Sequence, residues 1–138
     1  MMHQAQQFPF VTMNPTLGPS GLQPYLSVAL TLLDRSATAL GLLDTGATVN
    51  VLPYGVGLQL GAVWDSQTVP IRLTGNLAQV EARGLLVTAN VGRFSPVRLA
   101  FAWARTDAVP LLFGQLNFFQ EFDVCFFRSR SVFEIKPK

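Results

Sequence analysis

Residues 41–48 read GLLDTGAT, an apolar segment that ends in an aspartate, followed at once by a hydroxyl residue and a glycine. This pattern predicts a strand that places the carboxylate of Asp44 at its end. Gly46 lets the chain turn and lets backbone N–H groups approach the carboxylate. Thr45 offers a short hydroxyl that could bond to a neighbouring copy of the chain. Asp, Thr and Gly are also ordinary turn residues, so the tripeptide alone is equally typical of a plain turn after a strand.

A second apolar segment that ends in glycine, VPLLFG at residues 109–114, lies about 70 residues downstream of the aspartate. It continues into Phe118 and Phe119 and then into residues 122–124. In this order and at this spacing, the two segments resemble the active-site core of the retropepsin-like aspartic proteases. In that family the strand that carries the catalytic Asp-Thr-Gly lies beside a later hydrophobic-hydrophobic-Gly segment, and together they form a ψ-shaped substructure.

The resemblance covers residues 22–135 and implies three groups of site residues. The catalytic group is Asp44, Thr45 and Gly46. The substrate-binding group consists of Ala47 and a flap-like hairpin at Thr74, Gly75 and Asn76. The second half of the ψ substructure is Leu111, Leu112, Phe113 and Gly114. No metal ligand and no cofactor is implied.

Two positions depart from the family pattern. Many members carry Arg directly after the glycine of the second segment, where this chain has Gln115. Retroviral members pair that Arg with an acidic residue four positions after the catalytic aspartate, where this chain has Thr48. Because both ends of the ion pair are absent together, no charge is left buried without a partner.

Alternation of apolar and small or polar residues dominates the rest of the chain and predicts short strands. A Gly75-Asn76 pair suits a tight hairpin turn between two of them. The predicted strands are residues 26–32, 69–73, 77–83, 97–103, 122–126 and 132–135, with one short helix around 115–120. The fold class is therefore all-β, mainly β with one short helix, and the resemblance implies a closed, barrel-like acid protease lobe, one per chain.

The first 23 residues contain several prolines and glycines and predict an extended N-terminal arm. The protease-like domain is then residues 24–138. No secretory signal is visible at the start of the chain, and Cys125 is its only cysteine, which suits a reducing compartment. We therefore expect a cytoplasmic protein.

The composition argues for some partners and against others. Charged residues make up only 13% of the chain, against roughly 25% in an average soluble protein. Eleven of the 138 residues are Phe, so we expect part of this surface to be buried against a second copy. The ten basic residues are scattered, which argues against nucleic acid. No apolar run reaches the roughly 18 residues of a membrane span. One Cys and one His cannot supply the four ligands of a structural zinc site.

The family's chemistry needs two carboxylates, and this chain has a single Asp-Thr-Gly. The resemblance therefore implies a homodimeric aspartic endopeptidase with Asp44 of each copy on the two-fold axis, acting on a peptide or protein substrate. One alternative is a non-catalytic module of the same fold that dimerises or binds peptides. Another is an unrelated β-barrel interaction domain in which Asp44 only caps a turn.

Overall fold

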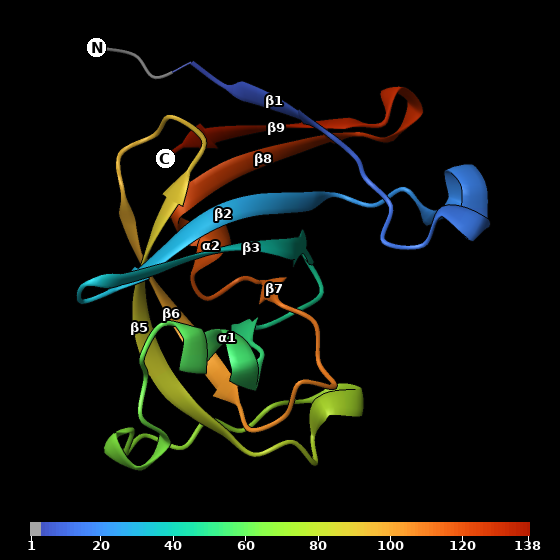
Figure 1. Ribbon diagram of the computed structural model, residues 1–138. Helices are drawn as coiled ribbons and strands as arrows, with labels where there is room; N and C mark the ends of the chain where they lie inside the picture. The colour runs from blue at the N-terminus through green and yellow to red at the C-terminus, as the bar shows by residue number, and fades with distance from the viewer. Residues whose placement is uncertain (1–3) are drawn as a thin grey trace.

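The computed structural model of the chain describes residues 4–138. Within them, one group of strands closes into a barrel and a second group forms a separate three-stranded sheet above it (Figure 1). The barrel order is β2 (Tyr25–Leu32), β3 (Arg35–Leu43), β7 (Leu112–Phe113), β4 (Asn50–Leu52), β6 (Val97–Ala104) and β5 (Ala82–Val91). The sheet order is β1 (Gln6–Pro9), β9 (Val132–Pro137) and β8 (Phe122–Phe127). The predicted all-β class is confirmed.

Period-two segments form the strands that they predict. In β2, Leu26, Val28 and Leu30 are buried, and this strand pairs antiparallel with β3 along its whole length. Strands β6, β8 and β9 also lie where the alternation predicts them. Because every second side chain of a strand points to the same face, each of these strands presents an apolar face to the core.

A continuous series of aromatic contacts joins the barrel to the three-stranded sheet. The ring of Phe113 in β7 lies 4.8 Å from that of Phe118, which lies 5.0 Å from that of Phe122 in β8. All three side chains are buried and belong to one cluster with Phe133 and Ile135 of β9. The two layers therefore share one core and hold a fixed relation to each other.

Part of the N-terminal segment, predicted as an extended arm, packs on the three-stranded sheet. Strand β1 pairs antiparallel with β9, and Phe8 and Phe10 pack on Phe133 with ring centroids 5.5 and 6.0 Å apart. Phe10 is only 7% exposed, so burial of these two rings outweighs the turn-forming residues around them. The 3-10 helix η1 (Pro15–Gly21) follows. Residues 1–3 of the predicted arm lie outside the described residues, and the boundary at residues 23 and 24 stays a prediction.

The predicted hairpin around Gly75 is a wide loop instead of a tight turn. Residues 69–73 form no regular strand, η3 (Gly75–Leu77) is a 3-10 helix, and β5 begins at Ala82, where a strand over 77–83 was predicted. Only an isolated pairing of Pro70 with Arg83 and two adjacent hydrogen bonds close the base of the loop. Proline lacks a donor for a ladder, and Leu73 folds inward onto a small second core. Both effects disfavour a flat hairpin.

Two short α-helices are present in the described chain, where the sequence predicts one. Helix α2 (Phe118–Glu121) lies at the end of the predicted range, whereas α1 (Tyr54–Gln59) was not predicted. The carbonyl of Tyr54 accepts a hydrogen bond of 3.2 Å from Trp103 Nε1, so packing fixes a helix that Gly55 and Gly57 disfavour. No helix within residues 4–138 has both the length and the apolar character needed to cross a membrane.

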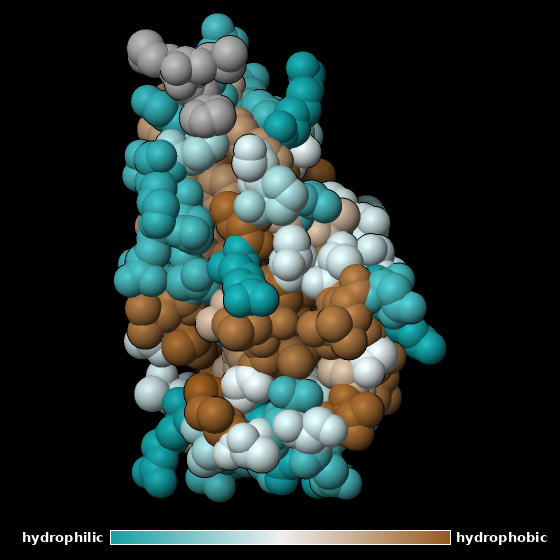
Figure 2. Space-filling view, turned by 90° about the vertical axis from the view of Figure 1, so that its left-hand side faces the viewer, coloured by the Kyte–Doolittle hydropathy of each residue, from teal (hydrophilic) through white to brown (hydrophobic). Residues whose placement is uncertain are grey.

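One face of the molecule carries a band of exposed apolar side chains across its middle (Figure 2). The turn between β2 and β3 points toward this face, and its Leu33 is 94% exposed with a φ of 54°. A groove of about 700 Å³ lies beside it, lined among others by Val63, Val69 and Leu86. The exposed apolar side chains therefore form a contiguous patch and are not scattered singly over the surface.

Candidate active site

Strand β3, which leads into Asp44, lies parallel to β7, a strand about 70 residues later in the chain. Leu42 pairs with Leu112, and Leu43 with Phe113. The N–H of Asp44 donates to the Phe113 carbonyl at 3.0 Å, which extends this ladder to the aspartate itself. Strand β7 also contacts β4 on its other side. The two predicted segments therefore lie side by side in the structure.

The turn after β3 fixes the Asp44 carboxylate. Its Oδ1 accepts a hydrogen bond of 2.9 Å from the N–H of Gly46, and its main-chain carbonyl accepts one of 3.0 Å from the N–H of Ala47. The side chain of Asp44 is half-buried, whereas Thr45 and Gly46 are exposed. The hydrogen bond from the Gly46 N–H therefore restricts the rotamer of the Asp44 side chain.

Gly114 lies where the later segment crosses behind this turn. A Cβ atom on Gly114 would be 2.5 Å from the carbonyl oxygen of Val49 and 2.7 Å from that of Ala47. Both neighbours are backbone atoms, so no side-chain movement can relieve the overlap. Among the standard residues, only glycine fits at this crossing without displacing the loop that holds Asp44.

Gln115 attaches the later segment to the aspartate turn. Its side-chain Nε2 donates to the carbonyl of Thr45 at 2.8 Å, and its N–H donates to the carbonyl of Ala47 at 2.9 Å. The N–H of Leu116 donates to the Thr48 carbonyl at 3.0 Å. An uncharged amide therefore contacts the turn at the position where many members of the resembled family carry Arg.

A buried amide supports the crossing from below and was not predicted from the sequence. Asn50 is 0% exposed, and its Oδ1 accepts a hydrogen bond of 2.8 Å from the N–H of Gly114. Its Nδ2 donates to the Ala100 carbonyl at 2.9 Å and to Asn117 Oδ1 at 3.2 Å. The sequence does contain a sign of this buried amide, because an Asn between Val49 and Val51 in an apolar strand needs buried hydrogen-bond partners.

A pocket of about 200 Å³ opens beside the carboxylate. Its lining includes Asp44, Gly46 and Ala47 together with the loop residues Thr74, Gly75 and Asn76. Its apolar walls are Val49, Val51, Leu73, Leu77 and Leu112. The structure thus brings the predicted aspartate turn and the predicted flap residues to one pocket. Thr45, Leu111, Phe113 and Gly114 do not line it, and the functional role of each predicted residue stays a prediction.

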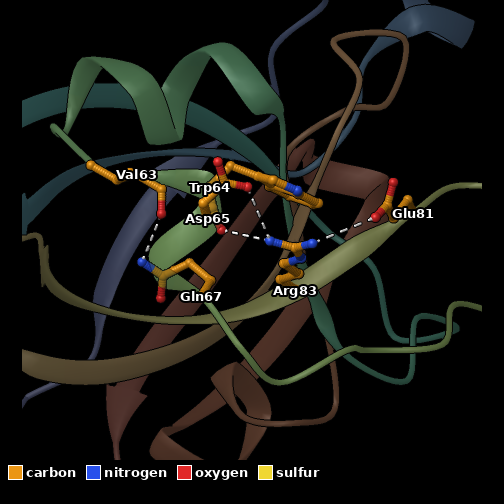
Figure 3. A network of polar contacts seen from close by, with 6 residues as sticks. All are labelled: Val63, Trp64, Asp65, Gln67, Glu81 and Arg83. Carbon is orange, nitrogen blue, oxygen red and sulfur yellow. Dashed lines mark hydrogen bonds and ion pairs between the residues drawn. The ribbon is translucent and has the colours of Figure 1, made fainter.

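The base of the loop over this pocket is held by Arg83 (Figure 3). Its guanidinium donates to the Trp64 carbonyl at 2.8 Å and lies 4.5 Å from the centroid of the Trp64 ring. Asp65 and Glu81 approach it at 3.9 and 4.0 Å, and both carboxylates are exposed enough for these ion pairs to be weak. The hydrogen bond to the Trp64 carbonyl and the contact with the Trp64 ring therefore fix the point at which the loop returns into β5.

Comparison with known proteins identifies the fold. No family model and no curated protein matches the chain. Among solved structures, it is similar to the crystal structure of a retropepsin-like aspartic protease from Rickettsia conorii, with a TM-score of 0.63 and 14% sequence identity. The match covers 98% of this chain and 93% of that one. At this identity the likeness shows the fold alone, and it confirms the predicted retropepsin-like lobe with its closed barrel.

Proposed function

We propose that this chain is one half of an aspartic endopeptidase, in which two copies each contribute Asp44 to a site that hydrolyses peptide bonds. The observation that carries the proposal is the position of the Asp44 carboxylate. It lies at the end of β3, oriented by the Gly46 N–H, and it lines a pocket that the loop at Thr74–Asn76 also lines. An aspartate that only caps a turn would not need both an oriented carboxylate and a place in the lining of a pocket.

A single chain supplies only half of such a site. The pocket of about 200 Å³ is smaller than the roughly 300–1,000 Å³ of a typical ligand site. Asp44 is the only carboxylate among its lining residues in the described chain. A two-fold axis beside Asp44 would place two carboxylates together and join two half-pockets into one cleft.

The proposed chemistry divides two roles between identical side chains. Two carboxylates about 3 Å apart cannot both be ionised, so the pair holds one proton. The ionised member accepts a proton from a bound water as its oxygen attacks the scissile carbonyl carbon, while the other member donates a hydrogen bond to the carbonyl oxygen. The C–N bond then breaks, and the leaving nitrogen takes up a proton from the pair.

The substrate that fits this arrangement is an extended peptide. The pocket combines one carboxylate with apolar walls from Val51, Leu73 and Leu112, which suits a hydrophobic side chain next to the scissile bond. The backbone of the loop above it has exposed groups at Thr74, Gly75 and Asn76 that could bond a peptide main chain. We infer that this loop acts as a flap.

The test is cleavage of a mixed peptide library by the purified parent across acid to neutral pH, with Asp44→Asn in parallel. The Asn variant keeps the size and a hydrogen-bond acceptor for Gly46, so it should fold as the parent does. The proposal expects cleavage by the parent and none by the variant. Equal cleavage by both would remove Asp44 from the mechanism. A folded dimer that cleaves nothing at any pH would favour the alternative, a non-catalytic module that dimerises or binds peptides.

A further inference from the structure

Arg83 connects three segments that meet at the base of the loop over the pocket (Figure 3). It is the second residue of β5, and its backbone pairs with Pro70 in the arm that leads out to the loop. Its side chain donates to the Trp64 carbonyl in η2 (Trp64–Ser66), the short 3-10 helix that precedes this arm. One side chain therefore joins both arms of the loop to the element from which the loop starts.

The main-chain contacts at this base are few. The N–H of Ile71 donates to the Ala82 carbonyl at 3.0 Å, and the N–H of Gly84 donates to the Val69 carbonyl at 2.8 Å. Pro70 lies between these two bonds and has no N–H to add another. Two strands with so short a ladder are marginally stable without further contacts. The backbone alone therefore fixes the angle of the loop only weakly.

The tip of the loop depends on its base because it has few contacts of its own. In the described chain, every hydrogen bond made by residues 72–80 stays within the loop. Leu73 packs in the small second core, and beyond it residues 74–76 are exposed. At about 3.3 Å per residue, Gly75 can lie up to about 13 Å from Ile71, so a rotation of about 10° at the base would move it by about 2 Å.

We propose that Arg83 is a positioning residue of the active site, and that it acts by holding the loop at one angle through Trp64. The inference rests on the proposed function, in which the backbone of residues 74–76 bonds the main chain of a peptide. Arg83 does not line the pocket at Asp44, so its effect reaches the peptide through the loop. A shift of about 2 Å at the tip would break such bonds, because hydrogen bonds require heavy-atom distances of about 2.7–3.2 Å.

Trp64 is a rigid anchor for this purpose. It is 4% exposed, and its ring lies 5.2 Å from that of Trp103, a fully buried residue of β6. The Arg83 guanidinium donates to the Trp64 carbonyl and also lies 4.5 Å from the centroid of its ring. A planar guanidinium can make both contacts together, whereas the ammonium group of lysine lacks the flat surface for the second.

The two acidic neighbours of Arg83 do not explain its position. Asp65 and Glu81 lie 3.9 and 4.0 Å from the guanidinium, and their side chains are 95% and 58% exposed. The Arg83 side chain is only 27% exposed. Exposed ion pairs at such distances contribute little to stability. The hydrogen bond and the ring contact with Trp64 therefore carry the positioning role.

The first experiment compares the cleavage kinetics of one peptide with the parent, Arg83→Lys and the double variant Asp65→Asn, Glu81→Gln. Arg83→Lys keeps the charge but loses the planar group. Its KM should rise about tenfold with kcat within about twofold, because the loop bonds the peptide in the ground state and in the transition state alike. The double variant should keep both constants within about twofold of the parent.

This split separates positioning from a loss of stability. A variant that only unfolds more easily would have a lower apparent kcat and the KM of the parent, which would overturn the inference. A rise in KM of the double variant equal to that of Arg83→Lys would also overturn it, because the ion pairs would then hold the loop. Urea unfolding of each variant determines the folded fraction.

The second experiment measures amide hydrogen exchange in an Asp44→Asn background, so it does not depend on cleavage. The N–H groups of Ile71 and Gly84 close the base and report its opening. In Arg83→Lys both should exchange about tenfold faster or more, while amides of β2 exchange as in the parent. The double variant retains Arg83 and should match the parent, which tests the inference even if Arg83→Lys does not fold. Unchanged exchange in Arg83→Lys, or faster exchange in the double variant, would refute it.

These outcomes also distinguish the inference from the proposed function. A parent that cleaves peptides, with an unchanged KM in Arg83→Lys, would retain the protease and reject the role of Arg83. A parent that cleaves nothing, with faster exchange at Ile71 and Gly84 in Arg83→Lys, would show that Arg83 holds the loop and that the protease proposal is wrong.

Discussion

Replacing Gly114 by Ala should destabilise the protein because the new Cβ atom has no room. The ideal position of that atom is 2.5 Å from the Val49 carbonyl oxygen, 2.7 Å from that of Ala47 and 2.8 Å from the Val49 carbonyl carbon. Overpacking in a core typically costs about 1–3 kcal/mol. Since all three neighbours are backbone atoms of the turn that holds Asp44, we expect about 3 kcal/mol, the upper end of that range.

The matched control is Gly84→Ala in β5. There the Cβ atom would meet Ile71 and Val69 at 3.7 Å, an ordinary van der Waals distance. Alanine also reduces the conformational entropy of the unfolded chain. The free energy of unfolding of Gly84→Ala should therefore be unchanged or higher by about 0.4–1 kcal/mol. The two variants carry the same chemical change and differ only in the space that the fold provides.

The assay is urea unfolding followed by circular dichroism, with a thermal scan beside it. For a chain of this length, 3 kcal/mol corresponds to a fall in Tm of about 10 °C. Cleavage should also fall by about 100-fold well below the Tm, because the displaced turn carries Asp44. If Gly114→Ala unfolds at the same urea concentration as Gly84→Ala, the crossing of the two segments is not as described.

Three other results are expected. Asn50→Leu leaves the Gly114 N–H and the Ala100 carbonyl without their buried partner, so the free energy of unfolding in urea should fall by about 2 kcal/mol or more. An unchanged midpoint would show that the hydrogen bonds of Asn50 do not stabilise the protein. Gly75→Ala meets no atom within 4 Å but strains a φ of 64°, so peptide cleavage should slow and the Tm should fall by about 3–7 °C. An unchanged rate would place the flap elsewhere. Cleavage per chain should fall on dilution below the dimer dissociation constant, whereas a constant rate would indicate a competent monomer.

The sequence predicts most of the strands because each has one buried face. Alternation over residues 26–32 and 97–103 reflects burial of every second side chain, and the same rule would have placed β5 correctly from Leu85, Val87, Ala89 and Val91. The aspartate turn and the glycine segment were paired through their resemblance to the retropepsin-like family, and the structure supplies a physical reason for the glycine. Gly114 is the clearest case, since its neighbours allow no Cβ.

What could not be predicted depends on contacts between distant segments. Helix α1 forms around two glycines because Trp103 packs against it, and β1 forms because Phe133 buries Phe8 and Phe10. The loop at Gly75 folds inward because Leu73 is buried in a core with residues such as Val51, Ala102 and Leu112, which lie far from it along the chain. Local pattern carries no information about such partners.

If one active site takes Asp44 from each of two chains, mixing parent and variant chains must lower the activity. Parent protein is combined with Asp44→Asn chains at a fixed parent concentration, and subunits are allowed to exchange before peptide cleavage is measured. If chains pair at random, an equal amount of the variant should lower the activity per parent chain to about half, and a tenfold excess to about a tenth. Activity that stays constant at every ratio would mean that a single chain carries the whole site, and the shared dyad would be ruled out.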